Sequence, residues 1–271
     1  MVGTGCAPDV SYLKDKVIIV TGASKGIGLA AARSLLARGA RVALVARDRA
    51  RLEDAVTALG TEHALAVPGD VCDKAAVTAA VALVVRHWGR LDGLVNNVGF
   101  QFARRLEIMP ETEVRQLLEL NFLSAVFGSQ AAIPHLRASG GGRIVNISSA
   151  TVRHQNEFSH LGLYSASKAA LERFSSELRH ELKADKIMVT VLSSGAVATG
   201  SVANFDPQAL KEAMADWLTW GTHFDGALQP ETVGEAIAAC FEFPPGVALE
   251  FAEVRPNMPM PKMLESEWKP D

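Results

Sequence analysis

The chain has 271 residues, 48% hydrophobic and 21% charged, which is the length and composition of one large globular domain. Its 27 basic and 30 acidic residues give a net charge of −3, which argues against nucleic acid or an anionic membrane as a partner. No stretch approaches the roughly 18 uncharged apolar residues of a membrane span, and Met1 to Lys16 has no apolar segment after a basic start, so we expect neither an anchor nor a signal peptide.

Short continuous apolar runs alternate with helical patterns along the chain, as in strands that are covered on both faces. Strands are predicted at Val17–Val20, Val42–Val45, Ala64–Val67, Leu91–Val95, Ile144–Ile147, Met188–Leu192 and, more weakly, Leu249–Val254. Helices are predicted at Ile27–Ala37, Arg49–Leu59, Lys74–Trp88, Glu111–Leu136, Leu163–Ala184 and Glu231–Phe241. This repetition predicts an α/β fold: a single Rossmann-type, doubly wound domain with a parallel sheet of about seven strands and helices on both faces.

Three segments fall outside this pattern, and none is a linker that divides the domain 1–271. Residues 1–12 are expected to be frayed, and 256–271, with four prolines, to be extended. Residues 195–226 form the longest stretch without a strand and contain Trp217 and Trp220. A long insertion rich in aromatic residues is more often functional than disordered, so we predict a lid over the substrate there.

A glycine-rich turn follows the first predicted strand and opens an alanine-rich helix. It reads Thr21-Gly22-Ala23-Ser24-Lys25-Gly26-Ile27-Gly28. Glycines let the backbone N–H groups approach a pyrophosphate, and the positive end of the helix then faces that charge. In this context the turn predicts dinucleotide binding.

The end of the second predicted strand bears on the choice of cofactor. An acidic residue there binds the ribose 2′-hydroxyl of NAD, but this chain has Ala46 followed by Arg47. Arg47 suits a 2′-phosphate, and Lys25 in the glycine turn adds a second cation. The competing interpretation has Asp48 binding the ribose, although Asp48 also fits the N-cap of the next helix. We favour NADP(H) over NAD(H).

A tyrosine and a lysine share one face of the fifth predicted helix, in Tyr164-Ser165-Ala166-Ser167-Lys168. A free tyrosine has a pKa near 10, and a neighbouring ammonium favours its phenolate form. Tyr164 is therefore predicted to donate a proton to a developing alkoxide, or to accept one in the reverse direction. The Y-x-x-x-K pattern alone is a weak signal.

Several further motifs follow one another along the chain. Thr21 to Gly28 matches T-G-x-x-x-G-x-G, Asn96-Asn97-Val98-Gly99 is close to N-N-A-G, and Asp70-Val71 follows the third strand. Asn121 lies in the fourth predicted helix, and the fifth strand ends in Ser148-Ser149. From about Leu13 to Pro256 the chain resembles the short-chain dehydrogenase/reductase family, in its NADP-preferring carbonyl reductase branch.

The resemblance implies a catalytic tetrad of Asn121, Ser149, Tyr164 and Lys168. Ser149 would bind the substrate oxygen, Lys168 the nicotinamide ribose, and Asn121 would join a water relay to Lys168; Ser148 is the structural alternative at the strand end. The residues implied to contact the cofactor are Gly22, Ser24, Lys25, Gly26, Ile27, Gly28, Arg47, Asp70, Val71, Asn97, Gly99, Tyr164, Lys168, Val197 and Thr199.

Two departures from the family pattern stand out. Fourteen residues, 150–163, separate Ser149 from Tyr164, about two more than in many relatives. They include His154 and His160 and either contact the substrate or form a solvated loop. After the sixth strand, Ser194-Gly195 replaces the usual Pro-Gly, which leaves the local turn open.

These features predict an NADP(H)-dependent oxidoreductase that acts on an apolar ketone or secondary alcohol. One alternative is a β-ketoacyl thioester reductase, although no basic cluster for an acyl carrier is visible. Another is a cofactor-binding sensor without turnover, against which the intact tetrad argues.

Location, metals and assembly complete the expectations. The cysteines Cys6, Cys72 and Cys240 are far apart, without a C-x-x-C pair, which favours a reducing compartment and hence the cytoplasm. The histidines have no metal-ligand spacing, so no metal is predicted. By analogy the chain is a homo-oligomer, a tetramer or dimer, that pairs through its fourth and fifth helices. Apolar residues there, which could equally be core, are Ala125, Val126, Phe127, Leu171, Phe174 and Leu178.

Overall fold

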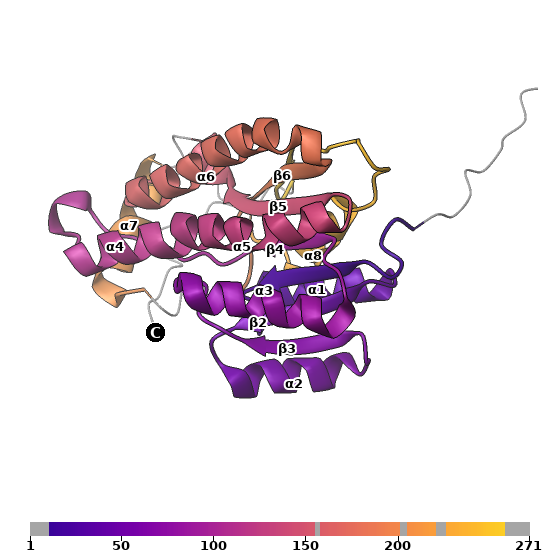
Figure 1. Ribbon diagram of the computed structural model, residues 1–271. Helices are drawn as coiled ribbons and strands as arrows, with labels where there is room; N and C mark the ends of the chain where they lie inside the picture. Colours follow the sequence, from indigo (N-terminus) through magenta and orange to yellow (C-terminus); the bar gives the residue numbers. More distant parts are fainter. Residues whose placement is uncertain (1–10, 155–157, 201–204, 221–225, 258–271) are drawn as a thin grey trace, which may run out of the picture.

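One sheet of seven parallel strands runs through the molecule in the order β3-β2-β1-β4-β5-β6-β7 (Figure 1). The computed structural model describes residues 11–154, 158–200, 205–220 and 226–257, without the side chains of Leu218 and Trp220. The strands are β1 Val17–Thr21, β2 Arg41–Ala46, β3 Ala64–Pro68, β4 Gly93–Asn96, β5 Gly142–Ser149, β6 Ile187–Ser194 and β7 Phe251–Val254. The predicted doubly wound sheet is confirmed, and its strand order reverses between β1 and β4, where such sheets bind ligands.

The helices follow the strands in alternation. They are α1 Gly26–Ala37, α2 Arg49–Leu59, α3 Lys74–Trp88, α4 Glu111–Leu118, α5 Ser124–Ala138, α6 Gly162–Glu181, α7 Pro207–Trp220 and α8 Pro230–Ala239. Short 3-10 turns lie at Leu106–Ile108, Ala150–Val152 and Lys183–Asp185. None of the helices in the described ranges combines the length and apolarity that a bilayer crossing requires.

Helices cover both faces of the sheet, and each face has its own apolar core. Successive residues of β1 alternate between the two: Ile18 and Val20 pack with α1, α2 and α8, whereas Val17 and Ile19 pack with α3, α5 and α6. A strand buried on both faces has no polar side, which is why the strand sequences are continuously apolar.

Helix α8 lies against α1 with almost no space between the two backbones. A Cβ atom at Gly234 of α8 would lie 2.6 Å from the carbonyl carbon of Ala30 in α1. Side chains essentially never approach this closely, so glycine is required at position 234 for this packing. The helix that follows the glycine-rich turn is therefore supported by α8 from behind.

Two predicted segments differ from the structure. The expected helix Glu111–Leu136 is interrupted by a π-turn at Glu119–Leu123 and ends at Ala138. The predicted lid 195–226 contains a helix, α7, that was not anticipated. Residues 1–10, 155–157, 201–204, 221–225 and 258–271, which include parts of the frayed, lid and tail predictions, lie outside the described residues.

A buried carboxylate ties the start of β1 to the start of β4. Asp92 accepts hydrogen bonds from the Val17 backbone N–H at 3.0 Å, from Lys16 Nζ at 3.1 Å and from Arg90 Nη2 at 2.6 Å. Burial acts to raise the pKa of Asp92, but the hydrogen bonds from Arg90, Val17 and Lys16 outweigh it and hold that pKa below its usual range. Asp92 is therefore ionised in the folded protein at neutral pH.

Replacing Asp92 with alanine is expected to lower the free energy of unfolding by about 2 kcal/mol, because a buried N–H and two cations lose their acceptor. Chemical denaturation measures this loss, and Asp54→Ala on the exposed face of α2 is the control. Because the folded pKa of Asp92 is depressed, its contribution is present above the unfolded pKa of about 4 and is lost as pH falls through the folded pKa. Equal stability of Asp92→Ala and the parent at neutral pH would contradict this assignment.

Candidate active site

The glycine-rich turn forms a cradle between β1 and α1 that admits no side chain. Gly22 and Gly26 adopt left-handed φ values of 66° and 56°. A Cβ atom at Gly28 would lie 2.5 Å from the Gly22 carbonyl oxygen and 2.7 Å from Nδ2 of Asn97. Helix α1 begins at Gly26, so its first N–H groups face this cradle. The turn therefore fits a pyrophosphate held by backbone N–H groups.

The asparagine motif after β4 braces the same turn. Asn97 Nδ2 donates to the Thr21 carbonyl oxygen at 2.9 Å, and the Asn97 N–H donates to the Thr21 hydroxyl at 3.0 Å. Asn96 instead lies in the core, where its amide donates to Asn146 Oδ1 at 2.8 Å. Of the two, Asn97 is the residue that faces the predicted cofactor site.

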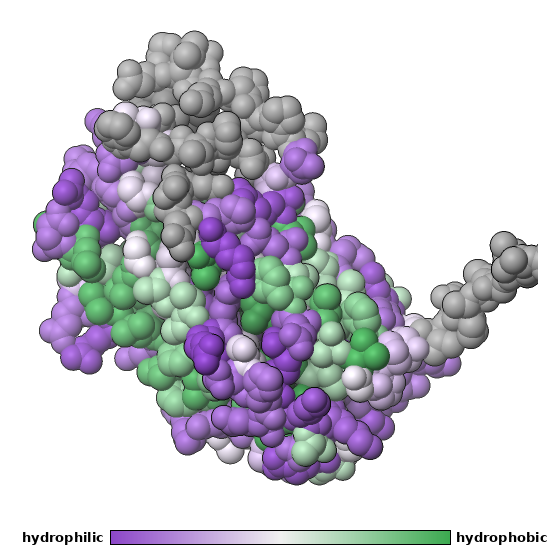
Figure 2. Space-filling model, turned by 90° about the horizontal axis from the view of Figure 1, so that it is seen from above, coloured by the Kyte–Doolittle hydropathy of each residue, from purple (hydrophilic) through white to green (hydrophobic). Residues whose placement is uncertain are grey.

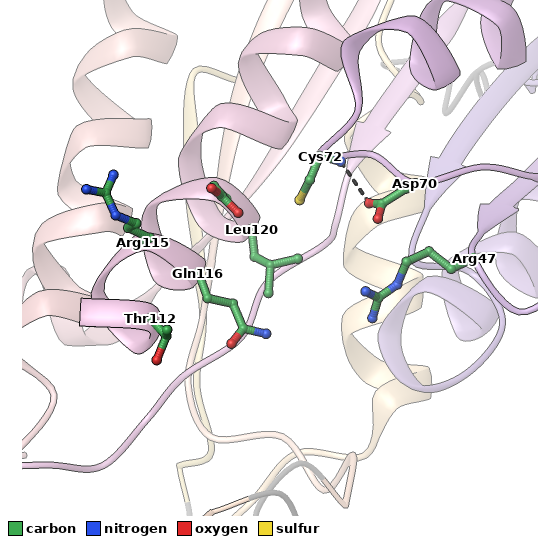
Figure 3. A pocket seen from close by; sticks show the side chains of 8 residues that line it. Arg47, Asp70, Cys72, Thr112, Arg115, Gln116 and Leu120 are labelled. Atoms are coloured by element: carbon green, nitrogen blue, oxygen red, sulfur yellow. Dashed lines mark hydrogen bonds between the residues drawn. The ribbon is translucent and has the colours of Figure 1, made fainter. Parts of the chain in front are cut away.

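A cavity of about 380 Å³ opens beside the carboxyl ends of β2 and β3 (Figure 3). Asp70 Oδ1 accepts the Cys72 backbone N–H at 3.0 Å and so fixes the turn after β3. The Val71 side chain is buried in the core beneath α3, so the contact predicted for Val71 would come from its main chain. The lining residues are Arg47, Asp70, Cys72, Thr112, Arg115, Gln116, Glu119 and Leu120.

Helix α4 and the π-turn supply the far wall of this cavity. None of the lining residues from these two elements was predicted from the sequence. Figure 3 shows Arg47 and Gln116 extending from opposite walls, while the Arg115 guanidinium points away from Arg47. The sequence does carry a sign of this wall. Thr112, Gln116 and Leu120 follow one another at intervals of four residues, which places them on one helix face.

The Cys72 thiol in this cavity is not an activated nucleophile. Burial raises its pKa to about 11, the charges of Asp70 and Glu119 act in the same direction, and Arg47 opposes them. Cys72 therefore remains a neutral thiol at neutral pH.

Three charged residues bear on the choice between NADP(H) and NAD(H): Arg47, Lys25 and Asp48. Arg47 and Lys25 are both exposed, and among the described residues neither has an ion pair. Asp48 caps α2, because its side chain accepts the Arg51 N–H at 3.1 Å and pairs with the Arg51 guanidinium at 3.2 Å. The N-cap interpretation of Asp48 is thus confirmed.

The end of β5 and the first turns of α6 bring Ser149, Tyr164 and Lys168 together. Ser149 lies beside the half-buried Tyr164, and its hydroxyl acts to lower the pKa of the tyrosine. The Ser149 hydroxyl also accepts the Thr151 N–H at 3.3 Å. Lys168 is buried and donates from Nζ to the Ile147 carbonyl oxygen at 2.8 Å.

The expected lowering of the tyrosine pKa is not found. Burial raises the pKa of Tyr164 above its usual value, and the hydrogen bond with Ser149 opposes this only in part. Burial also lowers the pKa of Lys168 to about 8. Burial therefore determines the direction of the Tyr164 shift, and the phenol is protonated at neutral pH.

Asn121 occupies the middle of the π-turn and braces the loop after β4. Its Oδ1 accepts the Phe100 N–H at 2.8 Å, and its Nδ2 donates to the Phe100 carbonyl at 2.8 Å and to Ser167 Oγ at 3.0 Å. A Cβ atom at Gly99 would lie 3.0 Å from Lys168 Nζ and 3.3 Å from Asn121 Oδ1. Gly99 thus lets Asn121 and Lys168 approach each other, although no direct hydrogen bond joins them within the described residues.

The segment after β6 returns to the glycine turn. Thr199 lies close to Gly26, whose Cβ atom would be 3.4 Å from the Thr199 Cγ2. Val197 forms a bridge with Leu228, which holds this strand-like segment in place. The Ser194-Gly195 turn packs against the residues that follow β7, because a Cβ atom at Gly195 would lie 3.1 Å from Cδ of Pro256. Ser24 and Ile27 are half-buried in the turn itself.

The segment 150–154 is anchored to the fold. Arg153 pairs with Glu172 of α6 at 2.7 Å and stacks on the Phe251 ring of β7 at 3.7 Å, and His154 Nε2 lies 2.8 Å from Glu253 Oε1. Ser148 donates to Glu172 at 2.6 Å, which gives Ser148 the structural role considered above. Residues 150–154 are therefore held by side-chain contacts with α6 and β7, whereas 155–157 lie outside the described residues.

Comparison with known proteins places this geometry in context. The model of the short chain dehydrogenase family matches residues 16–209. An 11-beta-hydroxysteroid dehydrogenase-like protein of Arabidopsis thaliana is 38% identical over 207 residues, which cover 75% of this chain and 65% of that protein. 

Two solved structures share the fold at 26% identity, each with a TM-score of 0.77 and coverage of 92% of this chain. One is an alcohol dehydrogenase from the archaeon Thermococcus sibiricus in complex with 5-hydroxy-NADP, covered over 99% of its chain. The other is a 3-ketoacyl-(acyl-carrier-protein) reductase from Brucella melitensis in complex with NADH, covered over its full length. Nicotinamide cofactors are thus bound by proteins of this fold, with and without the 2′-phosphate.

Proposed function

The chain belongs to the short-chain dehydrogenase family of oxidoreductases, and from this premise we propose that it is an NADP(H)-dependent reductase of ketones that also oxidises secondary alcohols. The observation that carries the proposal is the arrangement at the end of β5, where Ser149 lies beside Tyr164, one helical turn before the buried Lys168. The alternative of a cofactor sensor would have no use for this arrangement.

The proposed chemistry assigns one task to each side chain. The nicotinamide, when bound, supplies or accepts the hydride. The Ser149 hydroxyl holds the substrate oxygen beside the Tyr164 hydroxyl, and Tyr164 donates its proton as negative charge develops on that oxygen. Because the pKa of Tyr164 is raised, the phenol is protonated at neutral pH, which suits reduction. Lys168, with a pKa of about 8, is mostly cationic there and restores the tyrosine proton through its polar neighbours.

The preference for NADP(H) is proposed from four positions. Ala46 places no carboxylate at the end of β2, Arg47 and Lys25 are exposed cations, and Asp48 is engaged in capping α2. A 2′-phosphate would meet these two cations and no carboxylate at the end of β2.

A homo-oligomer is proposed as well, but with a smaller set of contact residues than the sequence suggested. Ala125, Leu171 and Leu178 are buried within the chain, so their core interpretation is correct. Leu118 and Leu123 are exposed beside them. The face seen in Figure 2 carries apolar residues in more than one group, separated by polar residues. Light scattering of the purified protein is expected to give a mass of two or four chains.

Oxidation of NADPH in the presence of a panel of carbonyl compounds tests the proposed function. We expect turnover of apolar ketones, with steroidal ketones included because a relative is named as hydroxysteroid dehydrogenase-like. The panel also contains β-ketoacyl thioesters, because one solved relative is a 3-ketoacyl carrier-protein reductase. Turnover confined to thioesters would replace the proposal with that second function. Cofactor binding without turnover of any compound would favour the sensor.

A further inference from the structure

The segment 158–160, which precedes α6, contacts two neighbouring residues of α7, Asp216 and Trp217. The rings of Phe158 and Trp217 meet edge to face at 5.5 Å between centroids, and Trp217 Nε1 donates to the Ser159 carbonyl at 2.8 Å. His160 Nε2 lies 2.8 Å from Asp216 Oδ2. An ionised carboxylate only accepts hydrogen bonds, so His160 is the donor. Helix α7 is thereby fastened to the segment that leads into Tyr164.

His160 is held in a conformation that its residue type seldom adopts. Its φ is 65°, in the left-handed region that costs a residue with a Cβ atom. The ring is only 7% exposed, whereas Asp216 is 42% exposed, and the His160 carbonyl accepts the Arg104 N–H at 3.0 Å. Such a conformation persists where the surroundings fix it, and strained residues are concentrated at functional sites.

The other end of α7 is fastened through the side chain of Arg104. Arg104 pairs with Glu113 of α4 at 2.9 Å and lies 3.8 Å from Asp206, directly before α7. Between the two fastenings lies an apolar cluster that includes the ring of Tyr164. Its members are Ala103, Phe158, Leu161, Tyr164, Phe205, Leu210, Ala213 and Trp217.

We propose that His160 and Asp216 are positioning residues, which hold Trp217 and Phe158 beside Tyr164 as the wall that selects bulky apolar carbonyl substrates. This inference rests on the proposed function, since it names the substrate class of the same site. The contact between His160 and Asp216 involves neither Ser149 nor Lys168, so it acts by fixing α7. A pre-formed wall spares a bulky substrate the cost of ordering it, whereas a substrate too small to reach Trp217 gains nothing.

The test compares the largest and the smallest ketone that the parent protein reduces. Asp216→Ala and His160→Asn are expected to raise KM for the large ketone about tenfold, to leave KM for the small one unchanged, and to keep kcat for both within about twofold. Asparagine tolerates the left-handed backbone at position 160 but is too short to preserve the contact. The double variant is expected to be close to Asp216→Ala, because that variant already removes the His160 contact together with the longer one from Ser159 Oγ at 3.5 Å. Asp216→Glu retains a carboxylate and is expected to restore part of the selectivity.

Glu212→Gln is the matched control, because Glu212 is an exposed residue of α7 that accepts a hydrogen bond from Gln208 of the same helix. Hydrogen exchange of residues 207–220 gives a readout that requires no turnover. It is expected to accelerate in Asp216→Ala and His160→Asn but not in Glu212→Gln. Equal changes in KM for both ketones, or exchange of α7 that is unaffected by loss of the pair, would overturn the proposal. A parent protein without turnover whose α7 is nonetheless released in both variants would refute the proposed function and leave the fastening established.

Discussion

Tyr164→Phe is expected to lower kcat for ketone reduction at least about 100-fold, because the substrate oxygen loses its proton donor. The affinity for NADPH, measured by fluorescence titration without substrate, is expected to be nearly unchanged, because phenylalanine preserves the ring in its apolar cluster. The chain contains two tyrosines, so Tyr12→Phe, at the exposed start of the fold, is the matched control.

The pH dependence provides a second check on Tyr164. Its pKa is raised by burial, so the protonated phenol is the form present at neutral pH. Reduction is expected to slow as pH rises through that pKa, whereas alcohol oxidation, which needs the phenolate as base, is expected to accelerate over the same interval. Near-parental activity of Tyr164→Phe in either direction would show that another group transfers the proton.

Ala46→Asp combined with Arg47→Leu is expected to reverse the preference for the cofactor. Each charge-assisted contact to the 2′-phosphate contributes roughly 1.5–3 kcal/mol, or about tenfold to a hundredfold in affinity. The new carboxylate would repel that phosphate and accept hydrogen bonds from the unmodified ribose hydroxyls of NADH. Arg47→Leu alone is expected to weaken NADPH and to leave NADH nearly unaffected.

The measurement is kcat/KM with each cofactor for the parent and both variants. Arg49→Leu serves as the control for loss of a positive charge on the same segment, since Arg49 pairs with the exposed Glu53 of α2. Parental preference for NADH would refute the assignment of Arg47 and Lys25. It would also imply that Asp48 leaves its N-cap position to bind the ribose.

The strands were predictable from sequence because burial on both faces leaves a direct trace in residue type. Val17 to Val20 are all apolar for this reason, and the strand itself extends only one residue further. The π-turn at Glu119–Leu123 left no such trace, because one inserted residue changes the hydrogen-bond ladder without interrupting the apolar pattern. Asn121 was nevertheless identified, through its place in a motif.

Helix α7 did carry a signal that was overlooked. Asp206 accepts the Ala209 N–H at 2.8 Å and is followed by Pro207 at the first position of the helix. An acid before a proline is a known sign of a helix start. The contact between His160 and Asp216 could not have been foreseen, since 56 positions separate them and neither has a spacing that indicates a site.

The direction of the Tyr164 pKa shift could not be predicted from the sequence, for a different reason. The sequence places Tyr164 and Lys168 one turn apart, and from that distance alone the phenolate should be favoured. Burial of Tyr164 instead raises its pKa. That burial depends on α7 and on the apolar cluster that contains the tyrosine ring. Charge proximity can be predicted from spacing, but desolvation requires the assembled fold.

The close packing of α8 on α1 links the packing of two helices to the geometry of the cofactor site. Because Gly234 leaves no gap to the backbone of Ala30, any side chain there must displace one of the two helices. The N-terminus of α1 is the end that faces the phosphate cradle, so a substitution far from the cofactor site alters the direction of the N–H groups at that site. Selection for cofactor affinity therefore also restricts α8, and attempts to stabilise the protein by filling helix-helix contacts should leave position 234 unchanged.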